Sequence, residues 1–167
     1  MDAYVCTIAG SKGGVGRTTT AINIGTVFEE GGYEAVLVDA DLGMANVVKK
    51  LAVDPDVTLH DVLEELRERF DVVLIDTSPT LSHELAVPLG LADGTLLVST
   101  PDSVALTDAG RTADLADRVD GNVFGLALTR VTEGDQTEVD TGDLDAPLLG
   151  VVPEDDDETG GGFSIFV

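Results

Sequence analysis

Six short, mostly apolar runs dominate the sequence. They occupy residues 4–9, 35–38, 72–75, 95–98, 123–128 and 148–152. Strands that are apolar at successive positions are buried on both faces, which is typical of a parallel sheet covered by helices. Helical patterns lie between several of these runs, as crossover connections between parallel strands require. The sequence therefore predicts an α/β fold with a mainly parallel β-sheet flanked by helices.

Three helices are expected between these strands. The first covers residues 18–30 and ends before Gly31, because glycine suits the left-handed turn that follows a helix. The second has one apolar face, built at three- and four-residue spacing from Leu59, Val62, Leu63, Leu66 and Phe70. Thr58 is available as its N-cap. The third covers about 103–119.

The length and composition fit a single folded unit. A chain of 167 residues with 43% apolar composition can bury one core without disulfides or metals. We expect the domain to span residues 1–153, followed by an acidic and glycine-rich tail at 154–167. Cys6 is the single cysteine, so no internal disulfide can form, and a buried structural thiol is favoured over a reactive one.

The charge is strongly acidic and spread along the chain. Asp and Glu total 32 against 9 Lys and Arg, a net charge of −23. Long-range repulsion then opposes binding to nucleic acid and to anionic lipid. The pattern resembles proteins of salt-loving cells, since at molar salt the screening length falls to about 3 Å. An ordinary acidic protein is the alternative interpretation.

No apolar stretch has the length of a membrane-spanning helix, and the first residues do not resemble a signal peptide. We therefore expect a cytoplasmic protein. Residues 163–167 are too short and uncharged to act as a basic amphipathic membrane anchor, so no such anchor is expected.

A glycine-rich segment lies between the first strand and the first helix. Glycines let backbone N–H groups turn inward around an anion, the helix N-terminus adds its dipole, and a threonine hydroxyl can ligate magnesium. The predicted phosphate-binding residues are Ser11, Lys12, Gly13, Gly14, Val15, Gly16, Arg17, Thr18 and Thr19. Glycines alone would be weak evidence, because tight turns use them for steric reasons.

The string KGGVGRTT closely resembles the deviant Walker A motif of the MinD/ParA family of P-loop ATPases, which has a lysine ahead of its glycines. Residues 38–46 resemble the first switch region of that family, and residues 73–79 its second switch at the Walker B strand. Residues 100–109 and 149–154 resemble later blocks in the same order. The resemblance implies a P-loop NTPase with ATP and Mg²⁺ as ligands.

The resemblance also implies roles for individual residues. Lys12 would reach the phosphates of a second subunit in an ATP-dependent homodimer, although a free surface lysine is the alternative. Thr18 would ligate Mg²⁺ directly, and Asp76 would hold a magnesium-bound water. Asp41 would orient the attacking water close to the metal, or else be a plain turn residue.

Two further switch residues follow from the same resemblance. Asp39 would lie beside the phosphates, and Asn46 would belong to the first switch.

Between Asp41 and Asp76 the chain is much shorter than is usual in the family, which predicts the loss of part of the dimer surface. A single cysteine excludes the nitrogenase iron protein relatives, which bind an iron–sulfur cluster through several.

The chain departs from the family pattern at two binding positions. Arg17 replaces the lysine after the last loop glycine and would present a planar fork in place of a compact ammonium. The family reads adenine with an asparagine beside an arginine, where this chain has Thr129 and Arg130. Thr129 is either a purine contact or a plain strand residue. Pro153, in the last matching block, is assigned to the same nucleotide pocket.

Three functional interpretations remain from the sequence. The first is a slow Mg²⁺-dependent ATPase that serves as a nucleotide switch in cell division, partitioning or spatial positioning, together with an unidentified protein partner. The second is a nucleotide-binding regulator that does not hydrolyse ATP, and the third is a truncated relic. Arg17 and the missing segments favour the second and third interpretations.

Overall fold

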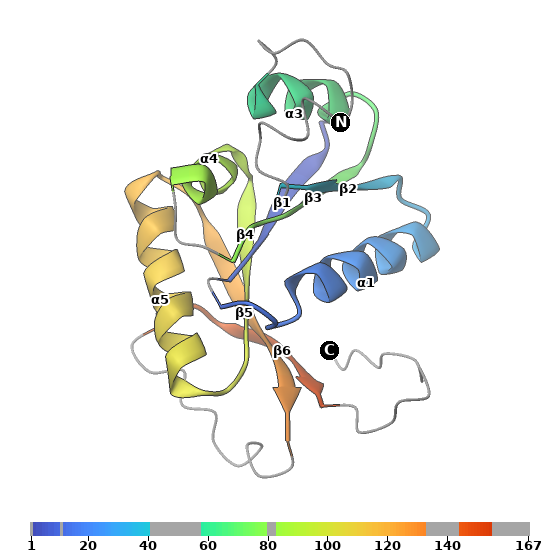
Figure 1. Ribbon diagram of the computed structural model, residues 1–167. Helices are drawn as coiled ribbons and strands as arrows, with labels where there is room; N and C mark the ends of the chain where they lie inside the picture. Colours follow the sequence, from blue (N-terminus) through green and yellow to red (C-terminus); the bar gives the residue numbers. More distant parts are fainter. Residues whose placement is uncertain (1, 11, 41–57, 80–82, 133–143, 155–167) are drawn as a thin grey trace.

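The computed structural model describes residues 2–10, 12–40, 58–79, 83–132 and 144–154. Its centre is a six-stranded sheet in the order β2-β3-β1-β4-β5-β6, in which every pairing is parallel (Figure 1). The strands are β1 Tyr4–Ala9, β2 Ala35–Asp39, β3 Val72–Asp76, β4 Gly94–Ser99, β5 Val123–Val131 and β6 Leu148–Pro153. The six predicted runs and the parallel sheet are confirmed.

Four helices lie within the described residues. They are α1 Arg17–Glu30, α3 Leu59–Arg67, α4 His83–Leu91 and α5 Ser103–Arg118. The Thr58 cap is confirmed as a capping box, in which the Thr58 hydroxyl accepts from the Asp61 amide at 3.3 Å while the Asp61 carboxylate accepts from the Thr58 amide at 2.8 Å. Helix α3 ends three residues before Phe70, whose amide donates to the Leu66 carbonyl.

Helix α4 was not predicted from the sequence. Pro88 lies inside it, and proline normally argues against a helix interior. Leu85 and Leu89 face the sheet core at helical spacing, but Ala86, Val87 and Leu91 are also apolar, so no polar face reveals the period in the sequence HELAVPLGL. The carbonyl of Pro88 accepts from the Thr7 hydroxyl at 2.9 Å, which ties the helix to β1.

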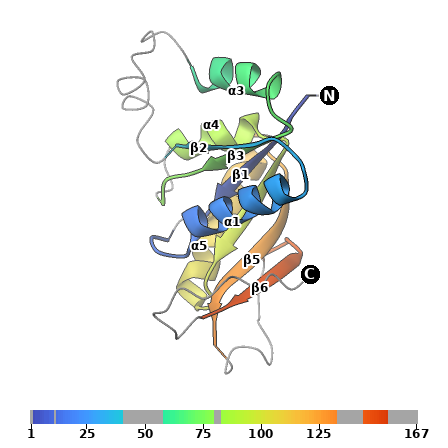
Figure 2. The ribbon, with the colours of Figure 1, turned by 90° about the vertical axis from the view of Figure 1, so that its right-hand side faces the viewer.

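The two faces of the sheet are covered differently. Helices α3, α4 and α5 pack on one face, and α1 packs on the other, over β1, β2 and β3 (Figures 1 and 2). The core under α1 includes Cys6, which is 6% exposed. Burial raises the pKa of the Cys6 thiol to about 12, so the thiol stays protonated and structural.

The amino edge of the sheet carries a compact polar network. The Arg67 guanidinium donates to the Ala3 carbonyl at 2.8 Å and to the Asp93 carboxylate at 2.9 Å. Asp93 also accepts from the Val5 amide at 2.8 Å. These bonds join the end of α3 to the starts of β1 and β4.

None of the helices in the described ranges is both long enough and apolar enough to cross a membrane.

Candidate functional site

The glycine-rich loop connects β1 to α1 at the carboxyl edge of the sheet. Gly14 (φ 80°) and Gly16 (φ 89°) have left-handed backbones that favour glycine. Gly16 is the N-cap of α1, and within the described loop no side chain caps the helix and no acidic residue lies in its first turn. The first amides of α1 and the positive end of its dipole are thus suited to an anion.

The loop faces open space on one side. A Cβ added at Gly13 or Gly14 would meet no atom within 4 Å. On the inner side, a Cβ at Gly10 would lie 2.3 Å from the Val98 carbonyl oxygen, so only glycine lets the loop leave the sheet there. Val15, 2% exposed, anchors the loop in the core under α1. The loop is therefore fixed from below and open above.

Thr129 supports this loop from the end of β5. Its buried hydroxyl lies 2.6 Å from the Val15 carbonyl and 3.3 Å from the Ser99 carbonyl, to which it can donate. Its side chain also lies 3.6 Å from where a Gly16 Cβ would be. Thr129 thus positions the loop, a role that sequence reasoning missed because the two segments lie far apart in the chain. Its purine contact stays a prediction.

Thr18 and Asp76 meet beside the loop. Thr18 is exposed in the first turn of α1, and its hydroxyl donates a hydrogen bond to the Asp76 carboxylate at 2.5 Å. Asp76, 4% exposed, ends β3, and its register partner Asp39 ends β2. Hydroxyl and carboxylate oxygens are ligands that Mg²⁺ accepts. The structure therefore brings together three predicted residues that are far apart in sequence.

Arg17 turns back onto its own loop. Its guanidinium donates to the carbonyl oxygens of Gly10 and, at 3.2 Å, of Lys12. These contacts use two donors of the fork that was expected to reach phosphate. Both bonds come from the same terminal nitrogen of the guanidinium, Nη1.

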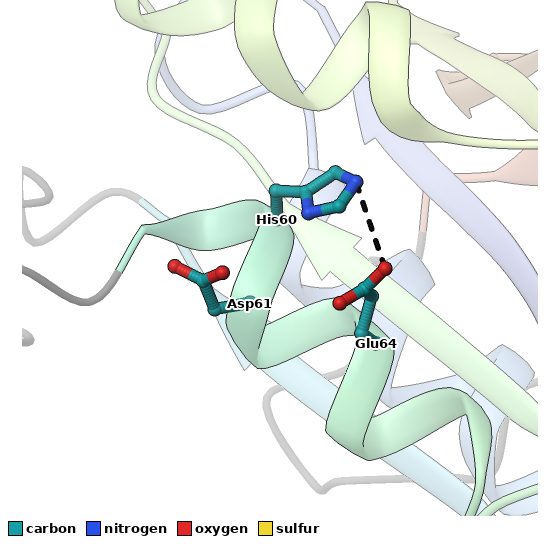
Figure 3. A group of neighbouring side chains, drawn as sticks. All are labelled: His60, Asp61 and Glu64. Carbon is teal, nitrogen blue, oxygen red and sulfur yellow. Dashed lines mark ion pairs between the residues drawn. The ribbon is translucent and has the colours of Figure 1, made fainter.

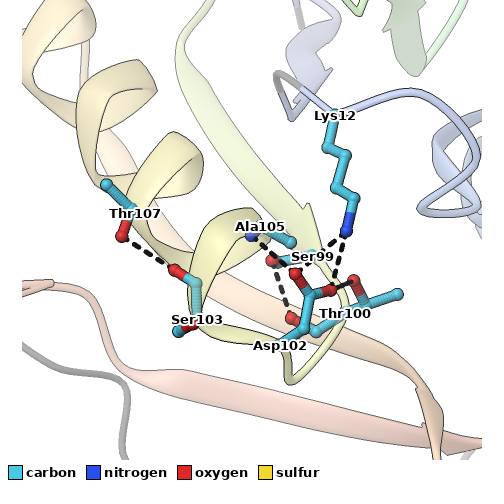
Figure 4. Close-up of polar contacts among 7 residues, drawn as sticks. All are labelled: Lys12, Ser99, Thr100, Asp102, Ser103, Ala105 and Thr107. Carbon is cyan, nitrogen blue, oxygen red and sulfur yellow. Dashed lines mark hydrogen bonds and ion pairs between the residues drawn. The ribbon is translucent and has the colours of Figure 1, made fainter.

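Lys12 is held by Asp102 (Figure 4). Its ammonium nitrogen lies 2.9 Å and 3.0 Å from the two carboxylate oxygens. Asp102 also accepts from the Thr100 hydroxyl at 2.6 Å and, as the N-cap of α5, from the Ala105 amide at 3.0 Å. The Thr100 hydroxyl first, and then Lys12 and Ala105, hold the pKa of Asp102 well below its usual range.

Asp102 was not assigned a role from the sequence, although an aspartate directly before a predicted helix is a recognisable N-cap signal. Its contact with Lys12 could not be read from the chain. The ion pair is partly exposed, with 42% of the Lys12 side chain and 45% of the Asp102 side chain accessible. A ligand can therefore compete for Lys12 from solvent.

Several predicted residues are not joined to this site. Ser11, Asp41 and Asn46 lie outside the described residues. Arg130 is exposed with a left-handed backbone (φ 54°), and Pro153 ends β6 beside Val131. Thr19 is exposed on α1, next to Thr18. The nucleotide contacts of these residues stay predictions.

A second group of polar side chains lies on α3 (Figure 3). His60, Asp61 and Glu64 are exposed and could place ligand atoms within 4.8 Å of one another. Asp61 is used in the capping box of α3, and His60 and Glu64 are spaced as a surface pair at 4.0 Å. The group is explained by the helix itself and does not belong to the loop site.

A match to a family model agrees with this geometry. Residues 6–159 match the CobQ/CobB/MinD/ParA nucleotide binding domain. The match covers most of the sequence, and the chain belongs to this family. The matched residues include the loop between β1 and α1 and the acidic end of β3.

The sequence is also similar to individual proteins of known name. The chain is 29% identical to a protein of Methanocaldococcus jannaschii described as an uncharacterized ATP-binding protein, over 78% of this chain and 66% of that one. It is 26% identical to the septum site-determining protein MinD of Bacillus subtilis, over 90% of this chain and 76% of that protein. It thus spans about two thirds of the first relative and three quarters of the second.

Solved structures share the fold. MinD of Pyrococcus horikoshii, complexed with Mg-ADP, has a TM-score of 0.72 and 26% identity, covering 92% of this chain and 82% of that chain. MinD of Aquifex aeolicus has a TM-score of 0.76 at 22% identity, with 92% and 84% covered, and shows the fold alone. The predicted MinD/ParA resemblance and P-loop NTPase fold are confirmed.

Proposed function

We propose that the chain binds Mg·ATP and Mg·ADP at the loop between β1 and α1 and acts as a MinD-like nucleotide switch. The contact between Thr18 and Asp76, next to a loop with open amides, carries this proposal. A hydroxyl and a buried carboxylate at the carboxyl ends of parallel strands form an oxygen-rich corner. The P. horikoshii relative complexed with Mg-ADP supports the same ligands.

The residues divide the binding between them. Amides of Gly13, Gly14 and Gly16 and the first turn of α1 would surround the phosphate oxygens, where no acidic side chain of the described first turn repels them. Thr18 would ligate Mg²⁺ through its hydroxyl, and Asp76 would hold a water of the metal. Mg²⁺ would supply positive charge that neutralises the phosphate oxygens.

Lys12 would change partners during the cycle. Its ammonium binds Asp102 on the same chain, and the family resemblance assigns it to the phosphates of a second subunit. Leaving Asp102 would uncouple Lys12 from the N-terminus of α5. An ATP-dependent homodimer built this way would connect nucleotide state to an unidentified protein partner. This would make the chain a switch for division, partitioning or positioning in the cytoplasm.

Slow hydrolysis is part of the proposal. Asp41 would orient the attacking water, and Arg17 would stabilise charge on the phosphates. A regulator that binds without hydrolysis is the second candidate, and one observation favours it: the guanidinium of Arg17 is bonded to the carbonyls of Gly10 and Lys12. These bonds turn one terminal nitrogen of the guanidinium toward the loop backbone.

The first test removes the metal ligand. In molar KCl, calorimetry with ADP in the presence and absence of Mg²⁺ should show at least a tenfold strengthening by Mg²⁺ in the parent, about 1.4 kcal/mol. Thr18→Ala should lose most of that gain, because it removes the direct protein ligand and leaves Asp76 to contact the metal only through a bound water.

The matched control is Thr26→Ala on the same helix, where the exposed hydroxyl only donates to the Ile22 carbonyl at 3.0 Å. This variant should bind like the parent. If Thr18→Ala keeps the full Mg²⁺ effect, the corner between Thr18 and Asp76 is not the metal site and the proposal fails at its main observation.

A further inference from the structure

The face of the sheet under α1 has an apolar groove next to that helix. Helix α1 covers β1, β2 and β3, and within the described chain no helix packs over β5 and β6 on this face (Figures 1 and 2). The groove has a volume of about 420 Å³, and its walls include Cys6, Ile24, Phe28, Leu74, Phe124 and Leu149. An uncovered apolar surface of this kind marks a site of contact.

Strand β6 forms the open side of the groove. Leu149 lies against Gly125 so closely that a Cβ at Gly125 would lie 2.2 Å from a Leu149 methyl carbon. Leu149 is still 49% exposed, and Tyr4, which also lines the groove, is 47% exposed. Leu148, its neighbour on β6, is 43% exposed but does not line the groove. The two leucines therefore provide a matched pair, one inside the groove and one outside it.

We infer that the apolar segment at residues 163–167, Phe-Ser-Ile-Phe-Val, packs into this groove. The segment lies outside the described residues, and the described chain leaves β6 at Pro153 after lining the groove with Leu149 and Val152. Residues 154–162 span up to roughly 30 Å when extended. Strand β6 is about 20 Å long, so the linker is long enough for the segment to return along it.

The composition of the two parts supports the same inference. Residues 154–158 are all acidic and suited to water, residues 160–162 are glycines that allow a reversal, and residues 163–167 carry no charged side chain. In a chain of net charge −23, a segment rich in Phe and Ile is unusual, and an apolar groove is the surface of the described chain that suits it. Covalent attachment raises its effective concentration there to about the millimolar range.

The test uses tryptophan fluorescence, because the sequence contains no tryptophan. In Phe166→Trp the new indole should emit at shorter wavelength in the folded protein than after unfolding, and should resist acrylamide quenching. Adding Leu149→Glu should shift the emission to that of the unfolded chain, because a carboxylate then lines the groove. Adding Leu148→Glu should leave emission unchanged. Circular dichroism checks that each variant folds.

A second groove variant, Tyr4→Ser, repeats the test if Leu149→Glu does not fold. Emission of Phe166→Trp that matches the unfolded chain would overturn the inference, and so would emission that ignores both groove variants. A blue shift that appears only as protein concentration rises would assign the groove to a second copy of the chain and also overturn it. These outcomes are independent of nucleotide binding.

Discussion

The two edges of the sheet use similar polar groups in different ways. At the amino edge, Arg67 bonds to Asp93 and to the Ala3 carbonyl, while Asp93 also accepts from the Val5 amide. Burial raises the pKa of Asp93, but the Arg67 and Val5 hydrogen bonds outweigh it and the pKa is lowered. These hydrogen bonds satisfy backbone groups at the start of β1 and join them to the residue that precedes β4.

At the carboxyl edge the polar contacts surround the glycine-rich loop, one side of which faces open space. Thr18 bonds to Asp76, Arg17 to loop carbonyls, and Lys12 to Asp102, while Gly13 faces open space. Each cation or hydroxyl there has a partner that a phosphate or a metal ion could replace. Exchangeable contacts around exposed backbone amides suit the carboxyl edge to a ligand, and the closed network at the amino edge lacks them.

Among the substitutions, Arg67→Ala at the amino edge should have the strongest effect on stability. Arg67→Ala should lower the free energy of unfolding by about 2 kcal/mol, because it removes charged hydrogen bonds to Ala3 and Asp93. Mg·ADP affinity should not change, since the two edges are independent. Arg69→Ala removes an exposed pair with Glu65 and should cost less than about 0.5 kcal/mol. Chemical denaturation and calorimetry on each variant measure both quantities.

The same variant has a predicted pH dependence. Because the folded pKa of Asp93 is lowered, its stabilising contribution is complete above its unfolded pKa of about 3.9 and is lost as pH falls through the folded value. The stability difference between the parent and Arg67→Ala should therefore shrink below about pH 4. A constant difference down to pH 2, or weaker Mg·ADP binding by Arg67→Ala at pH 7, would contradict the separation of the two edges.

A smaller effect is expected at the carboxyl edge from Arg17→Lys. A lysine ammonium is compact and suits the space between β- and γ-phosphates, whereas the planar guanidinium of Arg17 lies against the Gly10 and Lys12 carbonyls. A misplaced cation costs more in the transition state than in the ground state, so kcat should rise about tenfold, or about 1.4 kcal/mol, with less change in ATP affinity. A phosphate-release assay measures this.

Asp41→Ala is the companion variant for hydrolysis and should slow turnover in both backgrounds. If Arg17→Lys is no faster and Asp41→Ala changes nothing, the chain is a nucleotide-binding regulator without hydrolysis. If the parent already turns over as fast as Arg17→Lys, arginine is an adequate substitute at this position.

Much of the fold could be predicted because strands buried on both faces leave a direct signal. The run at 72–75 differs from β3 Val72–Asp76 only at its end, and the Thr58 cap follows from local chemistry. Helix α4 left no such signal, since Pro88 and an apolar composition on all sides hid its period. Sequence patterns therefore predict an element correctly where its own residues determine its conformation.

The candidate site divides in the same way. The loop and its threonine were predicted from neighbouring residues together with the family resemblance. The bond from Thr129 to Val15 and that from Lys12 to Asp102 each join segments about a hundred residues apart, so only the folded sheet brings the partners together. Asp41 and Ser11, outside the described residues, stay predictions.

One thermal measurement tests whether Mg·nucleotide binds at the carboxyl edge of the sheet. A ligand that binds only the folded state at about 100 times its Kd adds about 2.7 kcal/mol of stability. For a chain of this size that corresponds to roughly 5–10 °C in melting temperature. The buffer should contain molar KCl to screen the net charge of −23.

Saturating Mg·ADP should raise the melting temperature of the parent by that amount and leave Gly16→Asp unmoved, because a side chain at this left-handed position strains the loop beside Thr129 and adds a negative charge at the N-cap of α1. Gly32→Asp is the control, since Gly32 has a similar left-handed backbone (φ 85°) in the turn after α1 and should keep the full rise. A parent that does not respond to Mg·ADP, or a Gly16→Asp variant that responds equally, would contradict the account.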